Sequence, residues 1–193
     1  MKRLTDKNLN TGKHFDEVFS DGKKFDLERQ VEFYKKIKQG MKALDLGAGI
    51  RGFVELFRES GGKADVAELH ALDFSEFAKE EVLKKYPDIK YITGDVLNTP
   101  YQDGYFDLVG AGELIEHMED PEKLVQEMAR ITKIGGLMII STVDPDCEDS
   151  RGIDYPEHIW QFTPQDLIDL FVPYGKPEYR RIGNYDCVIT VKK

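Results

Sequence analysis

The sequence predicts one α/β domain, a mostly parallel seven-stranded sheet with helices on both faces. Short apolar runs alternate with amphipathic stretches along the chain, as in an open sheet with helical crossovers. The 193 residues are about the size of a single domain. Only residues 183–185 separate the last two apolar runs, which suits a hairpin and is too short for a parallel crossover. We therefore expect the last strand to be antiparallel.

Apolar runs mark the strands and helical spacing marks the helices between them. The expected strands are Lys42–Leu46, Glu68–Phe74, Lys90–Thr93, Phe106–Ala111, Leu137–Val143, Glu178–Ile182 and Asp186–Val191. Helical spacing indicates helices near 27–37, 53–59, 120–135 and 163–171. The third should begin at Asp120-Pro121 and stop at Gly135-Gly136, and the fourth should begin with a Thr163/Asp166 capping box.

The charge and the apolar pattern exclude several classes of protein. The chain has 27 Lys+Arg against 36 Asp+Glu, a net charge of -9. No basic residue lies between Lys90 and Lys123, so this surface should repel nucleic-acid phosphates. No apolar run is long enough for a membrane helix, and the first residues lack the apolar core of a signal peptide. We expect a cytoplasmic protein with neither nucleic acid nor membrane as its partner.

A glycine-rich turn follows the first predicted strand. Gly47, Gly49 and Gly52 have G-x-G-x-x-G spacing and precede a predicted helix. Glycines allow a tight turn and let a ligand approach the backbone at the helix N-terminus. This spacing alone also occurs in ordinary turns.

Two acids follow the next two strands at the same edge of the sheet. Asp73 ends the second strand, where a carboxylate can accept hydrogen bonds from both ribose hydroxyls of a nucleoside. Asp95 follows the third strand, and an isolated Asp there is most often a turn or helix cap. A glycine turn and two acids at three successive strand ends together favour a nucleoside-binding edge.

The segments DLGAG, LDFS, GDVLNTPYQDGYFDLV, GELIEHMEDP and ARITKIGGLMIIS resemble, in order and spacing, the motifs of class I S-adenosylmethionine-dependent methyltransferases. The similarity covers about residues 41–172 and is strongest to the small-molecule branch that includes the ubiquinone and menaquinone biosynthesis enzymes. It implies a Rossmann-like fold with S-adenosyl-L-methionine as cofactor. The implied cofactor-binding residues are Asp45, Gly47, Ala48, Gly49, Asp73, Phe74, Asp95, Val96, Gly110, Ala111, Gly112 and Glu113.

The chain is longer than this family's pattern between Gly52 and Asp73, with residues 61–65 as the apparent extra loop. If the second strand were centred on residues 64–67, Glu68 would become the ribose ligand. We favour Asp73, because Ser75 after it can cap the next helix.

His117 and His158 are the candidate general bases or acceptor contacts. If the stretch from 113 to 117 is helical, Glu113, Glu116 and His117 share one face. The quinone-biosynthesis O-methyltransferases have a similar E-x-x-E-H, and divalent-metal binding is known in that family, so these three are an alternative metal set. We predict no metal, because metal-free relatives also carry Glu-His here. The loop 144–157 is a predicted wall of the acceptor site.

The predicted function is methyl transfer from S-adenosylmethionine to an O or N nucleophile of a small molecule, by a monomer or homodimer. Residues 1–40 form an N-terminal helical arm or lid, and residues 41–193 form the methyltransferase domain. The alternatives are a nicotinamide-dependent oxidoreductase, which shares the glycine turn, and a non-catalytic protein of the same fold. The acid-rich strand ends argue against binding of a pyrophosphate.

Overall fold

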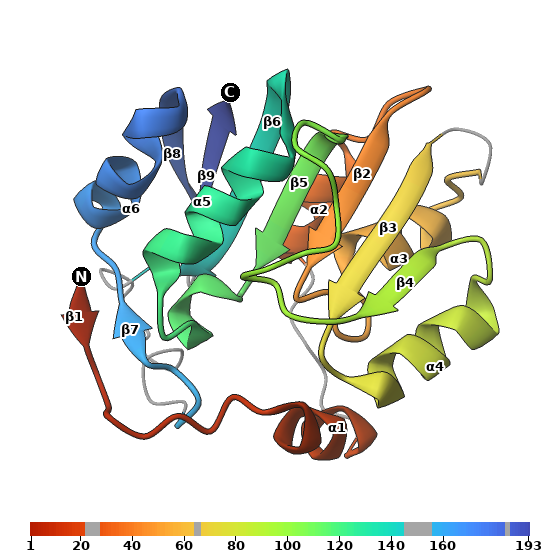
Figure 1. Cartoon of the computed structure of the whole chain (residues 1–193), viewed down its shortest axis with the longest axis horizontal. Coiled ribbons are helices and arrows are strands. Elements are labelled where there is room, and N and C mark those ends of the chain that lie inside the picture. Colours follow the sequence, from red (N-terminus) through yellow and green to blue (C-terminus); the bar gives the residue numbers. More distant parts are fainter. Residues whose placement is uncertain (22–27, 64–66, 145–155, 184–185) are drawn as a thin grey trace.

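The computed structural model describes residues 1–21, 28–63, 67–144, 156–183 and 186–193. A seven-stranded sheet lies at its centre with helices on both faces (Figure 1). Its strands are β2 (Lys42–Leu46), β3 (Glu68–Asp73), β4 (Lys90–Thr93), β5 (Phe106–Gly112), β6 (Thr132–Val143), β8 (Lys176–Ile182) and β9 (Asp186–Lys192). The seven predicted strands are thus confirmed. Their ends move by two residues at most, except that β6 begins at Thr132 and not at Leu137.

The strand order is β4-β3-β2-β5-β6-β9-β8. The pairs from β4 to β6 are parallel, whereas β9 pairs antiparallel with both β6 and β8. The predicted hairpin and the antiparallel last strand are confirmed. The carboxyl ends of β2, β3, β4 and β5 consequently meet at one edge, at the bottom of Figure 1.

Helices α2 (Glu28–Tyr34), α3 (Phe53–Glu59) and α4 (Glu76–Lys85) cover one face of the sheet. Phe33 and Phe53 are fully buried between these helices and the strands, with ring centroids 5.5 Å apart. Ser75 caps α4 by accepting a hydrogen bond from Ala78 N, as predicted. The glycine turn between β2 and α3 is therefore anchored on both sides by packed elements.

Helices α5 (Pro121–Ile131) and α6 (Pro164–Phe171) cover the opposite face. The predicted capping box at Thr163 and Asp166 is present. The predicted end of α5 at Gly135-Gly136 is wrong, because the helix ends at Ile131. Thr132 already belongs to β6, where it pairs with Phe106 of β5. Pairing with the sheet thus ends α5 before the glycines.

The N-terminal arm runs along the edge where the strands end (Figure 1). Its β1 (Lys2–Arg3) pairs antiparallel with β7 (Trp160–Gln161), and α1 (Gly12–Ser20) follows. Two short 3₁₀ turns, η1 (Ile115–His117) and η3 (Val172–Tyr174), complete the described elements. Residues 64 and 65 of the predicted extra loop and residues 145–155 of the predicted acceptor wall lie outside the described residues.

Candidate active site

The glycine turn has the backbone conformation that its sequence requires. Gly47 and Gly49 have φ angles of 65° and 48°, in the left-handed region that favours glycine. The N–H groups of Gly47 and Ala48 donate to the carbonyl of Leu72, the residue before Asp73, at 2.8 and 3.2 Å. The turn is therefore held against the end of β3.

Asp45 supports this turn from below. It lies in β2, is 2% exposed, and its Oδ2 accepts a hydrogen bond from Val54 N at 3.4 Å, in the first turn of α3. Burial raises its pKa well above the ordinary value, and the helix N–H donors act in the opposite sense. The contacts of Asp45 therefore tie β2 to the start of α3.

Asp73 joins the glycine turn to the start of α4. Its Oδ2 accepts from Gly49 N at 3.0 Å and its Oδ1 from Ser75 N at 2.8 Å. Burial raises the pKa of Asp73 to about 6, and the charge of nearby Asp16 adds to the effect. The next residue, Phe74, is 39% exposed, unlike the phenylalanines of the core.

Glu68 is ruled out as the ribose ligand. It begins β3, at the opposite end of the strand from Asp73. Its Oε1 accepts hydrogen bonds from Lys90 Nζ at 2.6 Å and from His70 Nε2 at 2.8 Å. The carboxylate therefore belongs to a hydrogen-bond network at the other edge of the sheet.

Asp95 and Val96 follow β4 at the carboxyl edge. Asp95 is exposed, and its Oδ1 accepts from Leu97 N at 2.8 Å, which is a local turn. Val96 is 9% exposed and packs in the core on the α5 side. Asp95 thus caps a turn, as an isolated Asp after a strand usually does. Its side chain is exposed and therefore also accessible to a ligand.

The end of β5 carries Gly110, Ala111, Gly112 and then Glu113. A Cβ atom on Gly110 would lie 2.6 Å from Phe53 Cε1, so this glycine makes room for the core. Glu113 has a φ of 50°, and its N–H donates to Ser141 O at 3.0 Å. The strand therefore ends in a sharp turn that leads directly into η1.

The 113–117 stretch is not the helix that would place Glu113, Glu116 and His117 on one face. Only Ile115–His117 form a 3₁₀ turn, and Glu113 lies before it with a positive φ. The residues that come together are Glu116, His117 and His158, whose ligand atoms all lie within 4.8 Å of one another. Sequence reasoning singled out both histidines but did not connect His158 with Glu116, since 41 residues and a predicted loop separate them.

His117 is held as a neutral imidazole. Its Nδ1 lies 3.0 Å from the carbonyl oxygen of Glu157, and its ring centroid is 4.8 Å from that of His158. Burial, together with the neighbouring His158, lowers the pKa of His117 to about 4. Because a carbonyl only accepts, Nδ1 carries the proton and Nε2 carries the lone pair.

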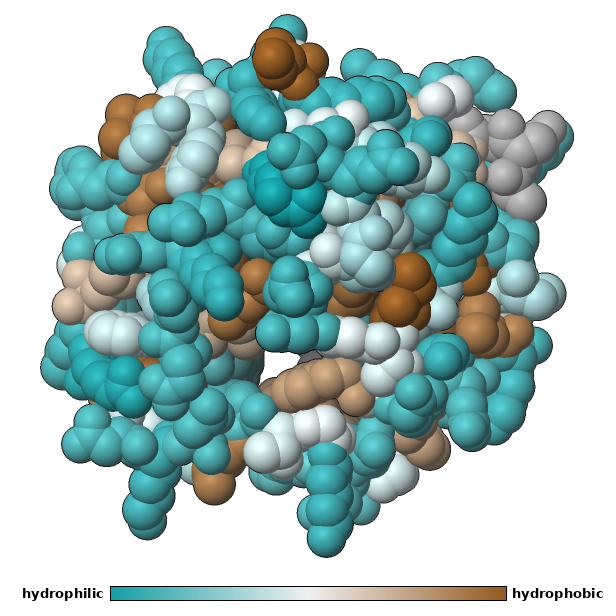
Figure 2. All heavy atoms as spheres, viewed as in Figure 1, coloured by the Kyte–Doolittle hydropathy of each residue, from teal (hydrophilic) through white to brown (hydrophobic). Residues whose placement is uncertain are grey.

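The arm places aromatic residues of α1 over these groups. The ring centroid of Phe15 lies 5.6 Å from that of Phe74 and 5.8 Å from that of His117. Phe19 packs on the turn, because a Cβ atom on Gly49 would lie 2.6 Å from Phe19 Cζ. Figure 2 shows a hollow between the arm and the strand ends above it. Phe15 thus connects the predicted cofactor side with the acceptor side.

A family model for the methyltransferase domain matches residues 44–140, half of the chain. The chain belongs to this family. The match begins within β2, includes the glycine turn, Asp73 and His117, and ends within β6. This membership argues against the nicotinamide-dependent alternative.

Curated relatives of this methyltransferase domain carry two kinds of name. The chain is 32% identical to the demethylmenaquinone methyltransferase of Paenarthrobacter aurescens, over 65% of this chain and 47% of that protein. It is 34% identical to the norajmaline N-methyltransferase of Rauvolfia serpentina over 53% of this chain and 36% of that protein. In each case the match spans less than half the length of the relative.

The methyltransferase domain also matches solved structures over most of its length. The SAM-dependent methyltransferase of Aquifex aeolicus superposes with a TM-score of 0.71 at 18% sequence identity, covering 91% of this chain and 97% of that chain. The fold is that of the class I S-adenosylmethionine-dependent methyltransferases. Among the described residues, no helix is both long and apolar enough to cross a bilayer.

The strand-end residues fit S-adenosylmethionine. The Asp73 carboxylate has about four lone-pair sites, and backbone N–H groups of Gly49, Ser75 and Phe74 interact with it. The carboxylate can still accept a hydrogen bond from a ribose hydroxyl. The exposed ring of Phe74 can pack on an adenine. Gly47 and Gly49 carry no side chains of their own, and Leu114 and Phe19 lie against them.

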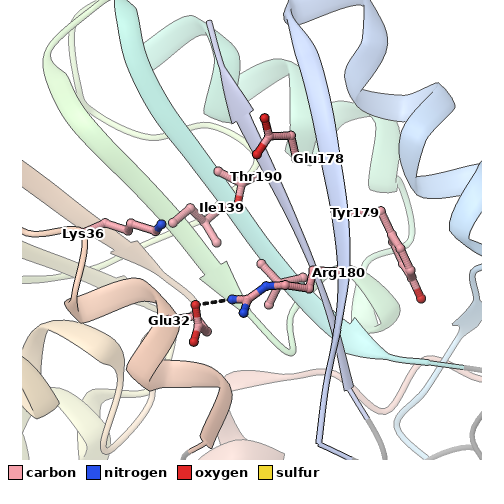
Figure 3. A pocket seen from close by; sticks show the side chains of 8 residues that line it. Glu32, Lys36, Ile139, Glu178, Tyr179, Arg180 and Thr190 are labelled. Atoms are coloured by element: carbon pink, nitrogen blue, oxygen red, sulfur yellow. Dashed lines mark hydrogen bonds and ion pairs between the residues drawn. The ribbon is translucent and has the colours of Figure 1, made fainter.

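A separate cavity of about 370 Å³ lies between α2 and the strands β6, β8 and β9 (Figure 3). Its lining includes the buried side chains of Ile139 and Val188, and Arg180 forms an ion pair with Glu32 at its side. Tyr179 points away from it. None of the predicted site residues lines this cavity, so it is distinct from the methyltransferase site.

Proposed function

We propose that this chain is an S-adenosylmethionine-dependent methyltransferase that acts on an O or N nucleophile of a small molecule. The observation that carries this proposal is the Asp73 carboxylate, bound to the glycine turn at Gly49 and adjacent to the exposed ring of Phe74. Family membership supports the same reaction. The names of the two relatives differ in their acceptors, so the choice of an O or N nucleophile rests on the site.

The methyl acceptor would lie on the side of His117 and His158. When bound, S-adenosylmethionine supplies a methyl group on a positively charged sulfur, which is already electrophilic. The protein therefore has to position the acceptor and exclude water. The neutral His117 can take the proton of an O–H or N–H group through Nε2 as the acceptor atom bonds to the methyl carbon and the carbon–sulfur bond breaks.

The arm completes this proposal. Residues 1–40 would close over the strand ends, and residues 41–193 would form the domain that carries the cofactor. Support comes from Phe19, which packs on Gly49, and from Asp16, which accepts a hydrogen bond from the Ser75 hydroxyl. Both contacts lie next to the proposed ribose site.

Calorimetry with S-adenosylhomocysteine tests the cofactor assignment. We expect binding with a dissociation constant in the micromolar range, because the turn and the Asp73 carboxylate are already in place. Titration with a nicotinamide dinucleotide is the matched comparison and should produce no heat of binding. Heat with the dinucleotide and none with S-adenosylhomocysteine would contradict the proposal.

A divalent cation at Glu116, His117 and His158 is the second candidate for the acceptor side. Two imidazoles and a carboxylate are ligands that Zn²⁺ and Co²⁺ accept. The cluster also has outer partners, since Thr142 Oγ1 donates to Glu116 Oε2 at 2.9 Å and Glu157 O accepts from His117. Under this candidate a metal would lie where the general base is proposed.

Cobalt spectroscopy separates the two candidates. If the cluster binds a cation, Co²⁺ added to the protein gives visible absorption bands that His158→Ala removes. Glu119→Gln, which changes a nearby exposed acid that is not in the cluster, should keep them. A spectrum without bands would leave His117 as the base of a metal-free reaction.

A further inference from the structure

Asn10 of the arm connects two segments that carry the acceptor-side histidines. Its Nδ2 donates to the carbonyl oxygens of His117 and Glu157, each at 3.0 Å. The first carbonyl belongs to η1 and the second to the segment just before His158. An amide NH₂ has two hydrogens, so this one side chain uses both of them to hold the two segments together.

The carbonyl of Glu157 is the shared point of this arrangement. It accepts one hydrogen bond from Asn10 and another from His117 Nδ1, both at 3.0 Å. The Glu157 side chain is also held by the arm, because its Oε1 lies 3.0 Å from His14 Nε2. The atom that determines which nitrogen of His117 carries the proton is thus itself held by the arm.

Backbone hydrogen bonds also link the arm, η1 and the segment before β7. Ile159 N donates to Glu116 O at 2.8 Å, and Leu4 N donates to Ile159 O at 2.8 Å. The arm, η1 and the segment before β7 are therefore linked in one hydrogen-bonded unit. The Asn10 side chain, itself part of the arm, donates to both of the other two segments.

The oxygen of the Asn10 carboxamide differs from its nitrogen in having no partner in the described part of the chain. Its Oδ1 is buried and has no hydrogen-bond partner among the described residues. A buried acceptor without a partner is costly, so a side chain kept for packing alone would be apolar here. The position therefore depends on the NH₂ group.

We propose that Asn10 is a positioning residue for methyl transfer, which holds the Glu157 carbonyl where it keeps His117 protonated at Nδ1. The Nε2 lone pair then faces the proton of the acceptor. This inference rests on the proposed function, and it gives the arm a role on the acceptor side in addition to covering the cofactor.

Nuclear magnetic resonance of the histidine ring nitrogens, at neutral pH with a chelator present, tests this role. The chain has only four histidines, so the spectrum is simple. In the unchanged protein His117 should be protonated at Nδ1. Leucine has a similar size to asparagine but no NH₂ group. In Asn10→Leu we therefore expect that His117 is no longer mainly protonated at Nδ1. His70, held by Glu68 and Tyr101, should be unchanged.

Lys13→Ala, at an exposed position of the same arm, is the matched control and should leave the His117 signals unchanged. If Asn10→Leu does not fold, Asn10→Ser serves instead, because its hydroxyl is too short to bridge both carbonyls. An unchanged His117 form in the Asn10 variant, or Nε2 protonation in the unchanged protein, would overturn the proposal. Failure of the unchanged protein to bind S-adenosylhomocysteine would instead count against the proposed function alone.

Discussion

Asp73→Asn lowers the affinity for S-adenosylhomocysteine about 10- to 100-fold, as expected for removing the charge that accepts a hydrogen bond from the ribose. The substitution keeps the size of the side chain. It also replaces one of the oxygens bound by Gly49 N and Ser75 N with a donor, so the glycine turn loses a contact as well. Titration calorimetry at pH 7.5 measures the change.

The pH dependence of the affinity for S-adenosylhomocysteine tests whether the Asp73 carboxylate binds the ligand. Burial raises the pKa of Asp73 to about 6, so protons compete with the ribose hydroxyls below that pH. Affinity should be constant above pH 6 and fall as the pH drops through 6, by up to about tenfold per unit. Asp73→Asn removes this dependence.

The stability of the protein without cofactor should change in the opposite sense. An acid with a raised folded-state pKa contributes stability that is fully present below its unfolded pKa and is lost as the pH rises through the folded value. For Asp73 that window runs from its ordinary value of 3.8 to about 6. As the pH rises through this window, the affinity for the cofactor should therefore increase, whereas the stability of the cofactor-free protein should decrease.

Asp169→Asn is the charge-matched control, because Asp169 is an exposed residue of α6 whose Oδ1 accepts a hydrogen bond from Gln165. It should leave cofactor affinity unchanged. Equal affinities for the unchanged protein and Asp73→Asn, with a normal Asp169→Asn, would remove the ribose role from Asp73.

Local rules were enough to predict the sheet and to place the glycine turn and Asp73 at one edge of it. Apolar runs located the seven strands, and the short connection at 183–185 predicted the antiparallel strand. The glycine spacing and Asp73 are features of adjacent strand ends, which parallel pairing brings together. These inferences needed only periodicity, turn chemistry and the order of the strands.

The acceptor side required contacts between residues far apart in the sequence. His158 meets Glu116 because Ile159 pairs with the η1 backbone, and no local pattern marks that contact. The positive φ of Glu113 likewise interrupts a stretch whose spacing suits a helix. Asn10 carries no signal at all, since an isolated Asn in a polar arm is typical of a loop. Tertiary hydrogen bonds decided each of these positions.

Gly52→Ala should lower the free energy of unfolding by about 2–4 kcal/mol, the combined cost of overpacking and of weakened buried hydrogen bonds. Gly52 is the N-cap of α3 and has an ordinary φ of -61°, so the cost comes from space and not from backbone strain. A Cβ atom there would overlap Asp45 Oδ2 and lie 2.8 Å from the Ala48 carbonyl oxygen. Urea denaturation of the two proteins measures the difference.

Because the obstructing atoms include backbone, the chain can make room only by moving the turn or α3. The buried Asp45 carboxylate would then lose its donor at Val54, and Gly49 would shift relative to Asp73. We therefore expect Gly52→Ala to weaken cofactor binding together with stability.

Gly94→Ala is the matched control, since a Cβ atom on Gly94 meets only the Leu72 side chain, at an ordinary 3.8 Å. Its free energy of unfolding should stay within about 1 kcal/mol of the unchanged protein. If both variants were equally stable, the third glycine of the turn would be a neutral position, and the tight contact between Asp45 and the start of α3 would not be what holds the glycine turn in place.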